Sequence, residues 1–159
     1  MILAIKTNRS IVKKPNKKHS EILISPKSTN KVKSKQNRIM SKKTLVLGAT
    51  TNSSRYAYRA TDDLLQNGHE VVPVGIKKGE IFGHEIINDK SIQPEIDTVT
   101  LYVGPQNQAE WYDYILETKP KRIIFNPGTE NTELVKLAEN QGIEVENACT
   151  LVMLSVGSY

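Results

Sequence analysis

The segment at residues 43–73 constrains the fold of this chain more than any other part of the sequence. A run of leucine and β-branched residues ends at Gly48, a polar loop follows, and apolar residues then recur with the spacing of one helix face. Asn67-Gly68 is suited to end this helix, because glycine readily adopts the left-handed conformation beyond a last helical turn. A second apolar run follows directly. The segment therefore predicts a β-loop-α-β unit of about 30 residues, the building block of doubly wound parallel sheets.

The polar loop of this unit would lie at the N-terminus of the predicted helix. Unpaired backbone N–H groups and a partial positive charge make such a terminus a favourable place for a phosphate. Gly48 would let a ligand approach the backbone, and Arg55 adds a fixed cation. The alternative is that the Ser and Asn residues serve only as helix caps. The candidate phosphate-binding residues are Gly48, Ala49, Thr50, Thr51, Asn52, Ser53 and Arg55.

The loop matches neither of two common nucleotide-binding patterns. The dinucleotide pattern needs three glycines as G-x-G-x-x-G, but Thr50 and Ser53 stand where its second and third glycines would fall. The phosphate-loop pattern ends in G-K-[ST], which does not follow here. The sequence therefore argues against NAD bound in the usual way and against a hydrolysed nucleoside triphosphate.

Positive charge is concentrated at the start of the chain. Residues 1–39 hold eleven Lys or Arg and one Glu, a balance of +10, whereas residues 40–159 hold eleven basic and sixteen acidic side chains, a balance of −5. This composition predicts a disordered extension at 1–39 before one domain at 40–159. Three explanations of the extension stay open: residues upstream of a natural start at Met40, a tail with affinity for polyanions, or a targeting segment. The domain itself is not expected to bind nucleic acid.

The sequence predicts a cytoplasmic protein without a membrane span. The single cysteine, Cys149, excludes an internal disulfide and suits a reducing compartment. No apolar run approaches the roughly 18 residues of a membrane helix, and the apolar start of the chain is too short for a secretory signal.

Strand and helix patterns alternate through the rest of the chain. After the opening unit, strands are predicted at 82–87, 98–103, 122–125 and 143–145, and helices at 105–117 and from Thr129 or Asn131 to Gly142. The first of these helices would point Ala109, Tyr112 and Leu116 inward. This alternation predicts an α/β fold with a three-layer, Rossmann-like, doubly wound parallel sheet. We expect the strand order 3-2-1-4-5-6, with the strand at 82–87 as the third.

Ligands of such sheets bind beyond the carboxyl ends of the strands. The residues there are mostly small or proline, which suits an open crevice for an extended ligand, although turns favour the same residues. Besides the loop at Gly48, the candidate ligand-binding residues are Pro73, Val74, Gly75, Val103, Gly104, Pro105, Asn126, Pro127 and Gly128.

At about residues 43–155 the chain resembles the small stand-alone CoA-binding domain proteins, relatives of the CoA-binding domain of the succinyl-CoA synthetase α subunit. The resemblance rests on the order and spacing of several short pieces. They are VLGAT at 46–50 with Arg55 after it, GHEVVPV at 68–74, EIFG at 80–83, DTVTLYV at 97–103, PGTE at 127–130 and the segment 142–149.

The resemblance implies that this region binds coenzyme A or acyl-CoA. The loop from Gly48 to Arg55 would contact the CoA phosphates. The residues around Pro73 and Val74 would border the adenosine end, 103–105 the adenine or ribose, and 126–128 the pantetheine arm. Lys77 or Lys78 would reach the 3′-phosphate, unless both are ordinary solubilising charges. Such proteins usually have Asn-Pro where Gly75-Ile76 stands here, which weakens the assignment at the adenosine end.

The sequence offers little that suggests catalysis, and no catalytic residue or metal site is predicted. His69 and His84 do not lie at carboxyl ends of strands, so structural or solvated roles are favoured. Cys149 is interpreted as a small buried residue in preference to a reactive thiol.

Two functional hypotheses follow. The first is non-catalytic binding of CoA or acyl-CoA, with a homodimer or an acyltransferase as a partner. The alternative is an NAD(P)- or nucleotide-dependent enzyme with a degenerate glycine loop. Nucleic-acid binding through the tail is a third, weaker hypothesis.

Overall fold

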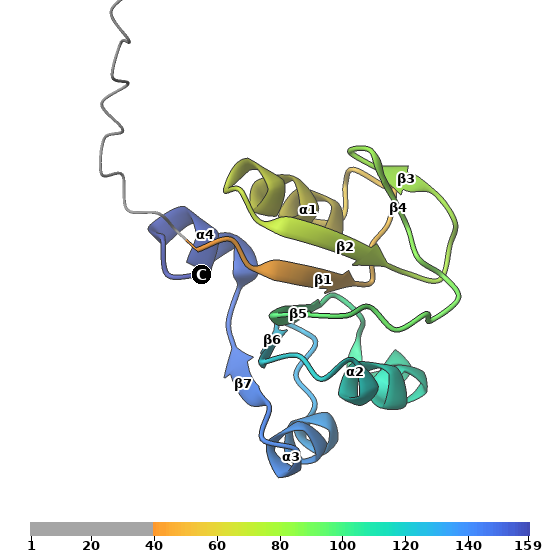
Figure 1. Ribbon diagram of the computed structural model, residues 1–159, viewed down its shortest axis with the longest axis vertical. Helices are drawn as coiled ribbons and strands as arrows, with labels where there is room; N and C mark the ends of the chain where they lie inside the picture. The colour runs from red at the N-terminus through yellow and green to blue at the C-terminus, as the bar shows by residue number, and fades with distance from the viewer. Residues whose placement is uncertain (1–39) are drawn as a thin grey trace, which may run out of the picture. The chain divides into compact units, whose positions relative to one another are not determined.

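A computed structural model describes residues 40–159, and the disorder predicted for residues 1–39 lies outside the described residues. In the described part, five strands form one parallel sheet, as the sequence pattern predicted. Across the sheet their order is β2-β1-β5-β6-β7 (Figure 1). The strands are β1 (Lys43–Leu47), β2 (Glu70–Val74), β5 (Thr98–Leu101), β6 (Arg122–Phe125) and β7 (Glu144–Asn147).

The predicted strand order 3-2-1-4-5-6 was wrong for strand 3, the strand predicted at residues 82–87. Residues 80–85 form a separate antiparallel hairpin of β3 (Glu80–Ile81) and β4 (His84–Glu85). Phe82 and Gly83 turn the chain at the tip of this hairpin with positive φ values of 50° and 82°. Because this turn leaves only two residues in each arm, the apolar run cannot continue as a sheet strand. Only Ile87 reaches the main sheet, through one parallel bridge to Val74.

Helices pack on both faces of the sheet and make the predicted three layers. Leu45 belongs to a buried apolar cluster that includes Leu134 and other residues of α2 (Tyr112–Thr118) and α3 (Thr132–Asn140). Val46, the next residue of β1, belongs to a second cluster with Leu64 of α1 (Tyr56–Gln66) and Leu154 of α4 (Thr150–Val156). Successive strand residues point to opposite faces, so β1 alone supplies both clusters. Figure 1 shows α1 and α4 near β1, and α2 and α3 near β6 and β7.

The helix predicted at 105–117 is divided. Two 3₁₀ turns, η1 (Pro105–Asn107) and η2 (Ala109–Trp111), precede α2. The inward residues are accordingly Trp111, Tyr114 and Ile115, whereas Ala109 is exposed, so the predicted inner face was wrong there. Tyr112 and Leu116, also predicted to point inward, are partly buried.

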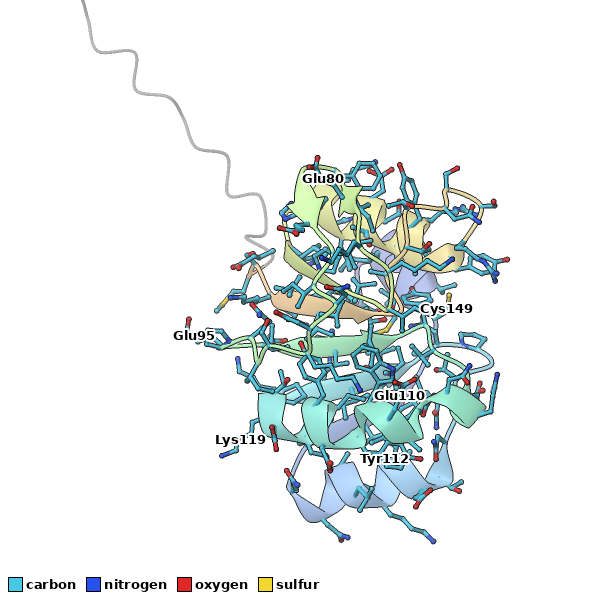
Figure 2. The ribbon with its side chains drawn as sticks, turned by 90° about the vertical axis from the view of Figure 1, so that its right-hand side faces the viewer. Glu80, Glu95, Glu110, Tyr112, Lys119 and Cys149 are labelled. Carbon is cyan, nitrogen blue, oxygen red and sulfur yellow. The ribbon has the colours of Figure 1, made fainter. Side chains whose placement is uncertain are left out.

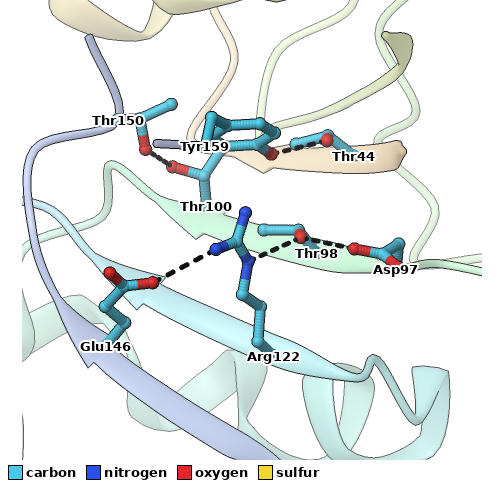
Figure 3. Close-up of polar contacts among 8 residues, drawn as sticks. All are labelled: Thr44, Asp97, Thr98, Thr100, Arg122, Glu146, Thr150 and Tyr159. Carbon is cyan, nitrogen blue, oxygen red and sulfur yellow. Dashed lines mark hydrogen bonds and ion pairs between the residues drawn. The ribbon is translucent and has the colours of Figure 1, made fainter. Parts of the chain in front are cut away.

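Buried polar side chains of β5 and β6 contact α4 and β7 (Figure 3). Thr100 Oγ1 lies 2.7 Å from Thr150 Oγ1 at the start of α4. Arg122 donates through Nε to Thr98 Oγ1 at 3.0 Å and pairs with the Glu146 carboxylate at 3.2 Å. Buried polar groups need such partners, so these contacts fix the positions of α4 and β7 on the sheet.

Candidate functional site

Four strand ends meet at what we call the carboxyl edge of the sheet. Leu47 of β1 pairs with Val74 of β2 and with Leu101 of β5, and Leu101 pairs with Phe125 of β6. The structure therefore brings together the four segments in which ligand-binding residues were predicted. Figure 2 views the molecule from the side toward which β1 and β2 point in Figure 1.

The start of the loop after β1 is packed tightly against protein. Gly48 has a φ of +98°, and a Cβ there would lie 3.0 Å from the carbonyl carbon and oxygen of Tyr102. The N–H groups of Gly48 and Ala49 both donate to the Val74 carbonyl oxygen at 2.9 Å. A Cβ on Gly75 would lie only 2.4 Å from the Ala49 carbonyl oxygen. The absence of a Cβ at Gly48 therefore serves loop packing, a role that the sequence did not indicate.

Backbone donors become available further along this loop. The Asn52 side chain stabilises the turn of this loop. Its Oδ1 accepts hydrogen bonds from the N–H of Ser54 at 3.0 Å and from the Ser54 hydroxyl at 2.6 Å. Within residues 40–159, the N–H groups of Thr50, Thr51 and Ser53 have no protein acceptor. These three donors are the part of the predicted phosphate loop that a ligand can use.

Positive charge at this end of the edge is not compensated by the nearby helix. Arg55 is the N-cap of α1, its side chain makes no capping hydrogen bond, and the first turn contains no acidic residue. The loop after β2, which contains the exposed Lys77, lies against the first loop, since a Cβ on Gly79 would be 2.5 Å from Thr51 Cγ2. The helix terminus and two cationic side chains thus belong to the same end of the carboxyl edge.

Several predicted site residues point into the protein. Pro73, Val74 and Ala49 are buried. Asn126 is 3% exposed, and its amide donates to Thr100 Oγ1 and accepts from the Thr150 N–H at 2.9 Å. These side chains hold the strand ends and α4 in place. Of the predicted residues after β6, only Pro127 and Gly128 are exposed, so they are the ones able to border a ligand.

A groove with a volume of about 530 Å³ lies at the other end of the edge, between the segment after β5 and the start of α3. Most of the residues that line this groove were not predicted from the sequence to belong to a site. Its walls include Pro105, Ala109, Tyr112, Glu130, Asn131 and Glu133.

A hydrogen-bond network holds the walls of this groove together. Gln108, which is completely buried, donates to the Val103 and Thr129 carbonyl oxygens at 2.8 and 2.7 Å. Asn131 Nδ2 donates to Gln108 Oε1 at 2.9 Å and to the Tyr112 hydroxyl at 2.8 Å. These hydrogen bonds hold the groove in shape without a ligand. The polar residues of the network are far apart in the sequence, and the one sequence signal for it is a glutamine within a helical pattern.

The histidines and the cysteine occupy positions that do not suggest catalysis. His69 is 4% exposed and accepts a hydrogen bond from the Lys42 N–H at 3.1 Å. It precedes β2, and His84 begins β4, so neither lies at the carboxyl end of a strand, as predicted. Cys149 is free and half-buried, so the prediction of a buried residue is confirmed in part. Figure 2 shows it on the viewed side.

No group of His, Cys, Asp or Glu among residues 40–159 could hold a metal ion. None of the helices in that range has the length and apolarity needed to cross a bilayer.

A family model described as a CoA binding domain matches residues 42–155. The chain belongs to the CoA-binding domain family. The match covers β1 through most of α4, including the strand ends of β1, β2, β5 and β6 at the carboxyl edge. The resemblance seen in the sequence is thereby confirmed. No curated protein matches the chain significantly.

Solved structures share this CoA-binding domain fold. An uncharacterized protein is 56% identical with a TM-score of 0.74, and the match covers 75% of this chain and 98% of that one. A hypothetical protein from Pyrococcus horikoshii OT3 is 28% identical with a TM-score of 0.67, over 74% of this chain and 84% of that one. A protein from Thermus thermophilus, 23% identical with a TM-score of 0.68, covers 75% and 91% and shows likeness of fold alone.

Proposed function

We propose that this domain binds CoA or acyl-CoA along the carboxyl edge of its sheet and performs no chemistry on it. The family match over residues 42–155 carries the proposal, because it spans the whole described sheet. A homodimer, an acyltransferase partner and a cytoplasmic location remain predictions from the sequence.

The CoA phosphates are assigned to the end of the edge near β1 and β2. The open N–H groups of Thr50, Thr51 and Ser53, the uncapped start of α1 and the Arg55 guanidinium all favour an anion there. Lys77, exposed in the neighbouring loop, is assigned to the 3′-phosphate.

The uncharged parts of the ligand are assigned to the rest of the edge. The exposed residues that follow the buried Gly75 border the adenosine end, and 103–105 lie along the adenine or ribose. Pro127 and Gly128 border the pantetheine arm, because both are exposed whereas the Asn126 side chain is used inside the protein. Binding across several strand ends needs no catalytic side chain.

Calorimetric titration of the full chain with CoA tests this proposal, with NAD and ADP as comparison ligands at about 0.15 M salt to limit binding by the basic tail. We expect Arg55→Ala to weaken CoA binding roughly tenfold through loss of a charge-assisted contact. Lys136→Ala, which removes an exposed cation from α3, is the matched control and should leave the affinity unchanged. Tight NAD binding without CoA binding would overturn the proposal.

A further inference from the structure

The carboxyl edge carries opposite charges at its two ends. Arg55, Lys77 and the open N–H donors lie near β1 and β2. The groove near β5 and β6 presents Glu130 and Glu133, and no cationic residue is among those of 40–159 that line it. A CoA thioester is also polar along its length, since phosphates charge one end and the pantetheine arm is neutral. The favourable orientation therefore directs the acyl end toward the groove.

The groove has the chemistry of a site for a short acyl chain. Pro105, Ala109 and the Tyr112 ring supply apolar contact surface. Both carboxylates are fixed by the protein: Glu133 Oε2 accepts from the Tyr112 hydroxyl at 3.2 Å, and Glu130 Oε2 accepts from the Gly128 N–H at 2.8 Å. A group entering the groove thus meets negative charge that is already in place.

We infer that this groove receives the acyl group of a bound CoA thioester and that Glu130 and Glu133 select against acyl groups bearing a carboxylate. The inference rests on the proposed function and specifies its ligand class as neutral or cationic acyl-CoA. Apolar contact with Tyr112 and its neighbours is the same for charged and neutral chains of one length, so the discrimination comes from charge.

Butyryl-CoA and succinyl-CoA form a suitable pair of probes, because both have four-carbon acyl chains and a carboxylate replaces the terminal methyl group in the second. The succinyl carboxylate would lie about 5 Å from the groove carboxylates at the protein surface, and this repulsion should make succinyl-CoA bind roughly tenfold more weakly than butyryl-CoA. The affinities are measured by calorimetric titration of the full chain at about 0.15 M salt. The ratio of the dissociation constants of succinyl-CoA and butyryl-CoA should decrease when the salt concentration is raised, because salt screens exposed charges.

The double variant Glu130→Gln, Glu133→Gln tests the role of the two carboxylates. It keeps side-chain oxygens that can accept the bonds from Gly128 and Tyr112, and it should bring the two affinities within roughly threefold. Glu139→Gln removes an exposed carboxylate from the other end of α3, and its ratio should equal that of the wild type.

The possible outcomes separate this inference from the function on which it rests. If the wild type binds CoA and binds succinyl-CoA as tightly as butyryl-CoA, the inference is overturned and the proposed function stands. A ratio that the double variant leaves unchanged overturns the role given to the groove. If neither free CoA nor any thioester binds, the proposed function falls and the inference falls with it. If the double variant is unstable, the single variants Glu130→Gln and Glu133→Gln are titrated instead, and a ratio that neither of them reduces overturns the role given to the groove.

Discussion

At the amino edge of the sheet, cationic side chains surround one aromatic ring. Lys42 Nζ and Arg122 Cζ lie 5.2 and 4.7 Å from the centre of the Tyr159 ring, and the centre of the His69 ring lies 4.9 Å from it. The Tyr159 hydroxyl is 2.6 Å from Thr44 Oγ1 (Figure 3). His69 accepts the Lys42 N–H through Nδ1, which a protonated ring cannot do. His69 is therefore neutral in this arrangement.

The free energy of unfolding should decrease as the pH falls through the titration of His69. Burial, followed by the charges of Lys42 and Arg122, lowers the pKa of His69 below its usual 6.5. Below about pH 6.5 the unfolded chain takes up a proton that the folded domain does not bind until its own lower pKa is reached. Stability is thus expected to be lost between these two pH values. Urea denaturation from about pH 7.5 to 5 measures it.

His69→Gln is the control for this dependence, because it removes the titration and keeps an acceptor for the Lys42 N–H. Asp97 titrates outside the range: although its burial raises the pKa, hydrogen bonds from Lys121 and Thr98 lower it below 3.8 overall. A flat wild-type profile, or a slope that His69→Gln leaves intact, would contradict the assignment.

At the scale of elements, the segment between β5 and α2 shows how one side chain alters a helix. Gln108 lies in the middle of a helical pattern, yet it is completely buried and bonded to the Val103 and Thr129 carbonyl oxygens. Holding its amide there favours two 3₁₀ turns over a continuous helix. Trp111 and Tyr114, which follow, are buried and pack edge to face with their ring centres 5.8 Å apart.

The start of α3 depends on Asn131. Its Oδ1 accepts from the N–H groups of Glu133 and Leu134 at 3.0 and 3.2 Å, and its amide joins the groove network. We expect Asn131→Ala to lower the free energy of unfolding by about 1–2 kcal/mol, because it removes the cap and leaves the buried Gln108 with one partner fewer. Urea denaturation gives the value.

Asn140→Ala provides the comparison, since Asn140 lies at the exposed end of the same helix and makes no side-chain hydrogen bond within residues 40–159. Its effect should stay within about 0.5 kcal/mol. Equal effects of the two substitutions would show that capping by Asn131 does not stabilise the domain.

At the scale of the whole molecule, the carboxyl edge joins segments that belong to separate β-α units. Bound CoA would contact loops after β1, β2, β5 and β6 together, so it should stabilise the domain as a unit. At a CoA concentration of 100 times Kd, the added free energy is about 2.7 kcal/mol, which raises the Tm of a domain this size by roughly 10 °C. A thermal melt monitored by circular dichroism measures the shift.

Arg55→Ala should show a smaller rise in Tm at the same CoA concentration, and Lys136→Ala should show the full rise. A Tm that does not respond to CoA at high concentration would mean that the folded domain does not bind it.

The sequence by itself determined the layered α/β architecture and the relative order of the five sheet strands. The elements follow from periodicity and turn residues, which act over short distances along the chain. The strand order follows from the few topologies that right-handed crossovers allow in doubly wound sheets. The order and spacing of several short pieces, from VLGAT at 46–50 to the segment 142–149, also indicated the CoA-binding family. The placement of α1 between a polar loop and Gly68 likewise needed only local signals.

Tertiary structure alone decided which of the predicted site residues face outward. Gly48 packs on Tyr102, Asn126 holds α4, and residues 80–85 turn back as a hairpin, because each contact involves a partner distant in sequence or a backbone turn set by packing. The acidic groove arose in the same way, from Tyr112 and Glu133 on two helices brought together by β6. Local patterns give a residue's neighbours along the chain, but the partners of a buried polar group are chosen by the fold.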